Sequence, residues 1–109
     1  MKRILKVWGY EDIICNTNKY SGKILVLKKG YQSSFHHHKI KDETFFILKG
    51  KILFRLGKNS YILKPGESVR IRPYQNHSFT GIKDSKIIEF ATKDIKTDTY
   101  RITNSRKVK

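Results

Sequence analysis

The four histidines of the chain carry its clearest chemical signal. They are His36, His37, His38 and His77, and the first three are contiguous. In an extended strand residues i and i+2 share a face, so His36 and His38 can direct their imidazoles to one point while His37 points the other way. Glu43 follows His38 after four intervening residues, a gap long enough for a turn that brings its carboxylate to the same point.

Imidazole nitrogens combined with one carboxylate are ligands for Mn, Fe, Co, Ni, Cu or Zn. We therefore predict that one divalent transition metal ion is bound by His36, His38, Glu43 and His77. In a six-coordinate geometry two positions would stay open for water or substrate.

Short apolar runs, rather than apolar residues at helical spacing, must position these side chains. The runs are residues 24–27, 45–48, 52–54, 61–63, 69–71 and 87–90. Turn signals rich in glycine, lysine and proline separate them. Many short strands with such turns predict an all-β sandwich or small barrel, with a hairpin tip at residues 57–59.

The chain of 109 residues and 12.9 kDa is expected to form one domain, since domains commonly contain about 100–150 residues. We expect an N-terminal arm or edge strand over residues 1–22 and a barrel over residues 23–104. Residues 105–109 are expected to form a basic tail.

Basic residues dominate the charge: 24 Lys and Arg face nine Asp and Glu, for a net charge of +15. Such an excess attracts anions. The basic residues are scattered, often just outside apolar runs, and no helix-turn-helix, zinc-finger or RNA-binding aromatic motif accompanies them. The sign of the charge alone does not choose among nucleic acid, phosphorylated metabolites and a membrane surface, but the missing motifs disfavour nucleic acid and leave a small-molecule partner such as an anionic metabolite.

Two further observations concern the compartment. Cys15 is the single cysteine, so it cannot form an intramolecular disulfide. No run approaches the ~20 apolar residues of a membrane-spanning helix, and no signal-peptide stretch follows the charged start. A cytoplasmic protein without a membrane partner is expected.

The spacing around the histidines resembles the first motif of the cupin family. Gly30, five residues, His36-x-His38, four residues, Glu43, six residues and Gly50 match that motif at every defining position. The resemblance implies a double-stranded β-helix, the cupin jelly-roll barrel, with the metal held inside. Gly30 and Gly50 would then occupy turns that need a positive φ.

A second stretch resembles the second cupin motif in spacing. It consists of Gly66, Arg72-x-Tyr74, His77 and Gly81. Arg72, Tyr74 and Gly81 replace the proline, glycine and asparagine of the family pattern. His77 keeps the place of the fourth metal ligand.

Within the cupins, the chain is similar to the cupin domain of bifunctional mannose-6-phosphate isomerase/mannose-1-phosphate guanylyltransferase enzymes. The residues that carry this similarity are Trp8-Gly9, Lys23, His36-His37-His38, Glu43, Gly50, Glu67-Ser68-Val69, His77 and Asp98-x-Tyr100-Arg101. The resemblance implies aldose–ketose isomerisation of a sugar or sugar phosphate, with an enediolate stabilised by the metal.

Four residues are expected to bind the substrate: Gln32, Arg72 and Tyr74 near the ends of the motifs, and Arg101 near the end of the chain. Arg72 and Arg101 are the expected partners of a phosphate group. The sequence identifies no catalytic base, although Glu11 and Glu67 are the carboxylates considered for it.

Two alternatives stay open: a non-catalytic cupin that binds a sugar or small anion, and an iron-dependent dioxygenase that uses the same ligands. Small cupins resemble one another in forming dimers, so a homodimer is a further expectation.

Overall fold

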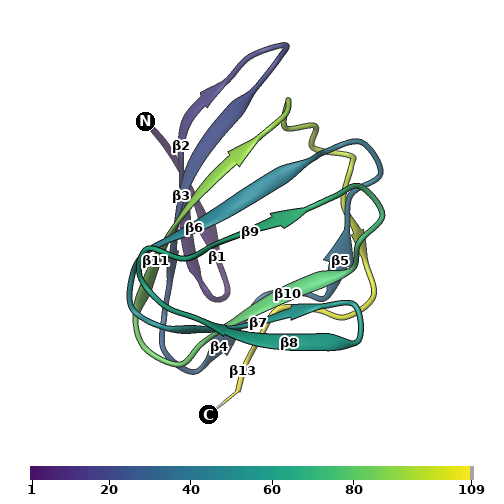
Figure 1. Ribbon diagram of the computed structural model, residues 1–109. Coiled ribbons are helices and arrows are strands. Elements are labelled where there is room, and N and C mark those ends of the chain that lie inside the picture. The colour runs from purple at the N-terminus through teal and green to yellow at the C-terminus, as the bar shows by residue number, and fades with distance from the viewer. Residues whose placement is uncertain (109) are drawn as a thin grey trace.

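The computed structural model describes residues 1–108, which form two antiparallel sheets (Figure 1). In order, the first sheet contains β1 (Lys2–Lys6), β2 (Gly9–Asn16), β3 (Ser21–Leu27), β11 (Ser85–Ala91), β6 (Glu43–Lys49) and β9 (Ser68–Ile71). The second contains β12 (Tyr100–Arg101), β5 (His36–His37), β10 (His77–Gly81), β4 (Tyr31–Gln32) and β13 (Arg106–Lys107), and β10 also pairs with β7 (Ile52–Leu56), which pairs with β8 (Asn59–Leu63). The predicted all-β jelly-roll fold is confirmed.

No helix occurs among residues 1–108, and hence none that is long and apolar enough to cross a membrane. All six apolar runs lie in strands, and the predicted hairpin tip joins β7 to β8, where Leu56 pairs with Asn59.

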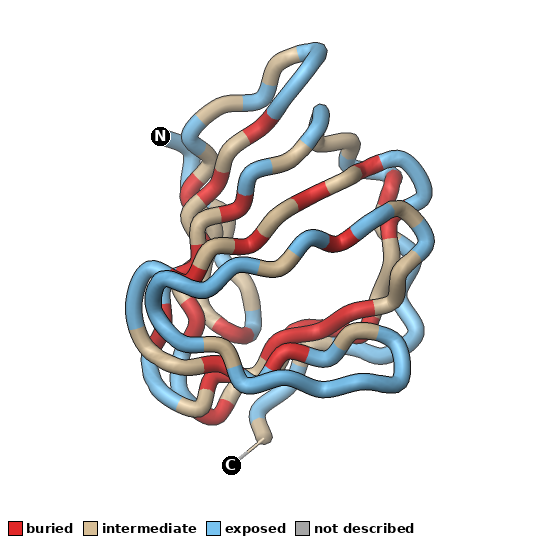
Figure 2. Tube along the Cα trace, in the orientation of Figure 1, coloured by how far each residue is buried: buried red, intermediate tan, exposed pale blue. Residues whose placement is uncertain are grey.

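The core lies between the sheets because their strands alternate buried and less buried residues (Figure 2). Its side chains are Trp8, Leu25, Leu27, Phe45, Ile47, Ile52, Phe54, Ile71, Phe79 and Ile87. Trp8 comes from the turn between β1 and β2 and packs edge-on against Phe79, with ring centroids 5.1 Å apart. This contact adds to the pairing of β2 with β3, which joins the N-terminal hairpin to the barrel.

The residues of the first sheet that face the interior are apolar at one end of the barrel and charged at the other. Leu25, Ile87 and Ile47 are neighbours across β3, β11 and β6 and form an apolar row. In the next row Lys23 pairs with Glu89, and both side chains are buried. Apolar residues therefore fill one end of the barrel, whereas charged residues face inward at the other.

Both predicted terminal segments take part in the sheets. β1 and β2 form a hairpin at the edge of the first sheet, within the expected arm of residues 1–22. In the expected tail, Arg106 pairs with Gln32 and Lys107 with Tyr31. Lys109, the last residue of that tail, lies outside the described residues.

Glycine is required by the backbone at the turns of the first motif. Gly30 has a φ of 80° and Gly50 a φ of 94°, which is the region that side chains disfavour. A Cβ on Gly50 would overlap the carbonyl oxygen of Asp84 and the hydroxyl of Ser85.

Replacing Gly50 by alanine should lower the free energy of unfolding by about 3 kcal/mol, because strain adds to the overlap. Gly57 is the matched control: its φ is 59°, but no atom lies within 4 Å of an added Cβ. Gly57→Ala should therefore cost only about 1 kcal/mol. Urea denaturation of the two variants measures both changes in the free energy of unfolding. Equal decreases for Gly50→Ala and Gly57→Ala would contradict this account of Gly50.

Candidate metal centre

Three imidazoles meet at one point inside the barrel. The ligand atoms of His36, His38 and His77 lie within 4.8 Å of one another. His77 opens β10 and pairs directly with His36 on β5, so neighbouring strands carry these two rings, and His38 follows β5 directly. Glu43, the first residue of β6, adds a carboxylate from the opposite sheet: its Oε2 is 3.2 Å from Nε2 of His38 and 3.4 Å from Nε2 of His77. The structure thus brings together all four residues that the sequence analysis proposed as ligands.

Backbone carbonyls orient the three rings. A carbonyl oxygen only accepts hydrogen bonds, so an Nδ1 beside one must carry the hydrogen, which leaves a lone pair on Nε2. The Nδ1 atoms donate to Ser34 O from His36 (2.8 Å), to Asp98 O from His38 (2.7 Å) and to Gln75 O from His77 (2.9 Å). Metal-binding histidines are typically held in this way.

The donor atoms fit a cation. Glu43 Oε2 and His77 Nε2 are buried and have no hydrogen-bond partner among the described residues. Such orphaned polar atoms are costly, and a cation between them would satisfy both. Burial also lowers the pKa of His36 to about 3, so its ring is neutral at neutral pH, as a ligand must be.

His37 points away from this centre, as its place between two inward residues requires. Its ring stacks between Tyr74 and Tyr100, at centroid distances of 6.2 Å and 5.3 Å. Its Nδ1 lies 2.9 Å from Oδ1 of Asn76 and donates to it. His37 is therefore the natural control for its neighbours.

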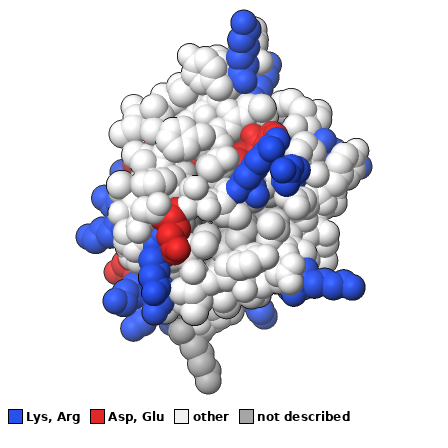
Figure 3. Space-filling view, viewed as in Figure 1, with Lys and Arg blue, Asp and Glu red and all other residues white. Residues whose placement is uncertain are grey.

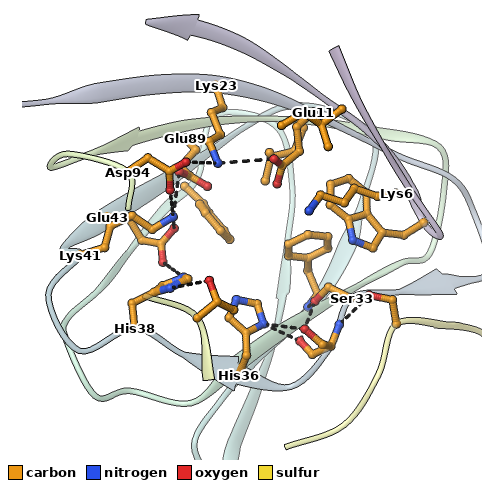
Figure 4. A pocket seen from close by; sticks show the side chains of 18 of the residues that line it. Lys6, Glu11, Lys23, Ser33, His36, His38, Lys41, Glu43, Glu89 and Asp94 are labelled. Carbon is orange, nitrogen blue, oxygen red and sulfur yellow. Dashed lines mark hydrogen bonds and ion pairs between the residues drawn. The ribbon is translucent and has the colours of Figure 1, made fainter. Parts of the chain in front are cut away.

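The centre opens into a cavity of about 240 Å³ (Figure 4). His36, His38 and Glu43 line one side of it. Five further charged side chains line the cavity and pair with one another, and we call them the polar wall: Glu11, Lys23, Lys41, Glu89 and Asp94. Lys41 lies beside Glu43, whereas Glu11 and Lys23 lie across the cavity from His36 and His38. Lys6 and Lys96 also line the cavity.

Lys41 connects the polar wall to the candidate ligands. Its Nζ is 3.3 Å from a carboxylate oxygen of Glu89, 3.3 Å from one of Asp94 and 3.8 Å from Oε1 of Glu43. Burial opposes the charge on Lys41, but these three carboxylates raise its pKa above the usual value. Lys41 is therefore a fixed cation that holds Glu43 in place.

Lys23 and Glu89 complete the polar wall. Lys23 Nζ is 3.0 Å from Oδ2 of Asp94 and 3.4 Å from Oε1 of Glu11. Burial, and next the charge of Glu43, raise the pKa of Glu89 to about 7. Near neutral pH this carboxyl group can therefore exist with or without its proton.

Asp98 fastens the turn between His38 and Glu43. Its carboxylate accepts hydrogen bonds from the backbone N–H groups of Lys39 (2.9 Å), Ile40 (3.2 Å) and Lys41 (3.0 Å). The backbone carbonyl of Asp98 also accepts the Nδ1 hydrogen of His38. Asp98, which lies in the segment after β11, therefore supports both the turn of residues 39–41 and the His38 ring.

Of the four residues predicted to bind the substrate, the structure places one at the cavity. Arg101 lines the cavity, whereas Gln32, Arg72 and Tyr74 are not among its lining residues. Gln32 pairs with Thr80 in the second sheet and Arg72 is exposed. Tyr74 has a φ of 70° and its ring stacks on His37, outside the barrel.

Of the two carboxylates considered as a base, Glu11 lines the cavity. Glu67 instead accepts a hydrogen bond from the backbone N–H of Lys64 at 2.7 Å, in an exposed turn. Sequence reasoning missed the roles of Lys23 and Glu89 in the polar wall. The available signal was their place in strands where every second residue is buried.

The sequence matches the family model described as "Cupin domain" over residues 23–90. The chain therefore belongs to the cupin family. Cupins commonly bind a metal, and the group of His36, His38 and His77 could hold one. No curated protein matches the sequence.

Solved structures share the fold at low sequence identity. KdgF from Halomonas sp. is 17% identical, with a TM-score of 0.76 over 81% of each chain. The capsular polysaccharide assembling protein CapF from Staphylococcus aureus is 19% identical, with a TM-score of 0.83 over 94% of this chain and 31% of that one. A Streptomyces PAC13 variant with uridine is 9% identical, with a TM-score of 0.83 over 94% of this chain and 84% of that one.

The predicted ligands can be tested by metal affinity. Loss of an outer-shell partner already weakens metal binding by about 10–100-fold, so His36→Gln, His38→Gln and His77→Gln should each weaken Co²⁺ binding by more than about 100-fold. His37→Gln should leave the affinity close to that of the wild type. Titration with Co²⁺, followed by its visible spectrum, measures the affinity of each variant. Equal effects of His36→Gln and His37→Gln would refute the assignment of the metal ligands.

The metal-free protein should lose stability in acid. The folded pKa of His36 is about 3 and its ordinary value is 6.5. Between these values the unfolded chain binds one more proton, so this group should lower the free energy of unfolding by about 1.4 kcal/mol per pH unit as the pH falls from about 6 to 4. Urea denaturation at each pH measures the slope. His36→Gln should flatten it by one proton, and an unchanged slope would contradict the burial of a neutral His36.

Proposed function

We propose that this cupin binds a sugar or sugar phosphate at a divalent metal ion and interconverts its aldose and ketose forms. The observation that carries the proposal is the convergence of three Nε2 lone pairs and the Glu43 carboxylate beside a cavity with a polar wall. A cavity of about 240 Å³ suits a small ligand.

The ion would be bound by His36, His38, His77 and Glu43, and when bound it polarises a carbonyl group and stabilises developing negative charge. Lys41 positions the second oxygen of Glu43 from 3.8 Å. Arg101 is exposed, lines the cavity and can attract a phosphate at its edge.

Isomerisation also needs a group that moves a proton between adjacent carbons. We assign this role to Glu89, which lines the cavity and is 3% exposed. Its pKa of about 7 suits both removal and return of a proton near neutral pH. Lys41, 3.3 Å away, steadies the ionised form.

Two observations support a sugar ligand. The polar wall offers carboxylate and ammonium groups, which hydrogen-bond to hydroxyls. The structure of CapF, named for capsular polysaccharide assembly, shares the fold. The overlap with CapF supports the choice of ligand class only by analogy, since it is under a quarter identical.

The surface charge fits a small ligand better than nucleic acid. In Figure 3 the Lys and Arg side chains are spread around the visible face rather than gathered in one stripe.

We also propose that the protein forms a homodimer and is located in the cytoplasm. Exposed Leu48 and Phe90, on the outer face of the first sheet, would be buried in such a dimer.

Wild-type protein loaded with Mn²⁺, Co²⁺ or Zn²⁺ should interconvert at least one aldose–ketose phosphate pair, as measured by NMR. Glu89→Gln should bind the metal equally well but turn over at least about 100-fold more slowly, since it cannot accept the proton.

Absence of interconversion across a panel of pentose and hexose phosphates would refute the isomerase proposal. Binding of a sugar without turnover would instead support the non-catalytic alternative. Oxygen consumption by the iron-loaded protein, and its absence with zinc, would support the dioxygenase.

A further inference from the structure

The polar wall occupies positions that a barrel normally fills with apolar residues. On β3 Lys23 shares its face with Leu25 and Leu27, and on β11 Glu89 shares its face with Ile87. Replacing such buried ion pairs by well-packed apolar side chains is often neutral or stabilising. The stability of the fold therefore does not by itself account for these charges, and they line the cavity.

Two members of the polar wall have hydrogen-bonding capacity left. An ammonium group has three donors, and Lys23 uses two of them, on Asp94 and Glu11. The carboxylate of Glu11 can accept several hydrogen bonds, and Lys23 is its one ionic partner among residues 1–108. Lys41, by contrast, is surrounded by three carboxylates.

The charge balance disfavours an anion at this wall. Three of its five members are carboxylates, those of Glu11, Glu89 and Asp94, and two are ammonium groups. The other cationic residues that line the cavity, Lys6, Lys96 and Arg101, are not members of the wall. A phosphate placed directly beside the Glu11 carboxylate would be repelled, whereas a neutral hydroxyl can both donate to Glu11 and accept from Lys23.

We propose that Glu11 and Lys23 form a polyol subsite, which binds the neutral hydroxyl groups of the ligand across the cavity from the metal. An anionic group of the same ligand then lies away from the wall, on the side of Arg101. This inference rests on the proposed function, because it assigns the hydroxyl groups of the sugar that do not take part in the reaction. Figure 4 shows Glu11 and Lys23 across the cavity from His36 and His38.

An alditol such as mannitol is a suitable probe, since it has the hydroxyls of a sugar but neither a carbonyl nor a charge. Zn²⁺-loaded wild-type protein should bind it in calorimetric titration, and Glu11→Gln should weaken this binding by about tenfold or more. Inorganic phosphate should not compete at the wall. Zn²⁺ affinity should be the same in both proteins.

Asp12 provides the matched control, because it follows Glu11 on β2, faces the other side and pairs with Arg3 at 2.8 Å. Asp12→Asn should leave mannitol binding unchanged. If Glu11→Gln does not fold, NMR of the wild type decides: mannitol should shift the amide signals of residues 10–12 and 22–24, and phosphate should not.

The outcomes separate the two proposals. Failure of mannitol to bind, or equal effects of Glu11→Gln and Asp12→Asn, would overturn the polyol subsite even if sugar phosphates are interconverted. Mannitol binding that depends on Glu11, without turnover of any sugar phosphate, would confirm the subsite and overturn the isomerase.

Discussion

The structure depends on one constraint: three imidazole lone pairs and a carboxylate must meet at a single point between two sheets. Backbone carbonyls set the rings, since Ser34, Gln75 and Asp98 accept the Nδ1 hydrogens. Glu43 comes from the facing sheet, so the centre exists only when the barrel is closed. In return, a cation at this point would tie both sheets together and add its binding free energy to folding.

The barrel accommodates this centre by dividing its interior. One end is a dry core around Leu25, Ile47 and Ile87. The other end buries Lys23 and Glu89 at positions with the same inward orientation. The apolar end supplies most of the hydrophobic stabilisation, which lets the polar end retain paired charges and an open cavity.

The sequence predicts strands and inward histidines well, because both follow from spacing along an extended chain. His36, His38 and Glu43 lie where their spacing indicates. Tyr74 does not line the cavity: it has a φ of 70° in the turn before β10 and its ring stacks on His37, and the period-2 rule for strands does not describe such a turn.

The ion pairs within the polar wall could not be predicted from the sequence, for a different reason. Lys41 and Asp94 lie outside the strands, and their partners are distant in the chain, so only the folded topology brings them together.

A crystal of the Co²⁺-loaded protein, measured by anomalous diffraction at the cobalt edge, tests the central claim most directly. The account predicts one strong peak per chain, enclosed by the Nε2 atoms of His36, His38 and His77 and a carboxylate oxygen of Glu43. A peak elsewhere, a peak bound through Nδ1 atoms, or no peak in a folded protein would contradict it.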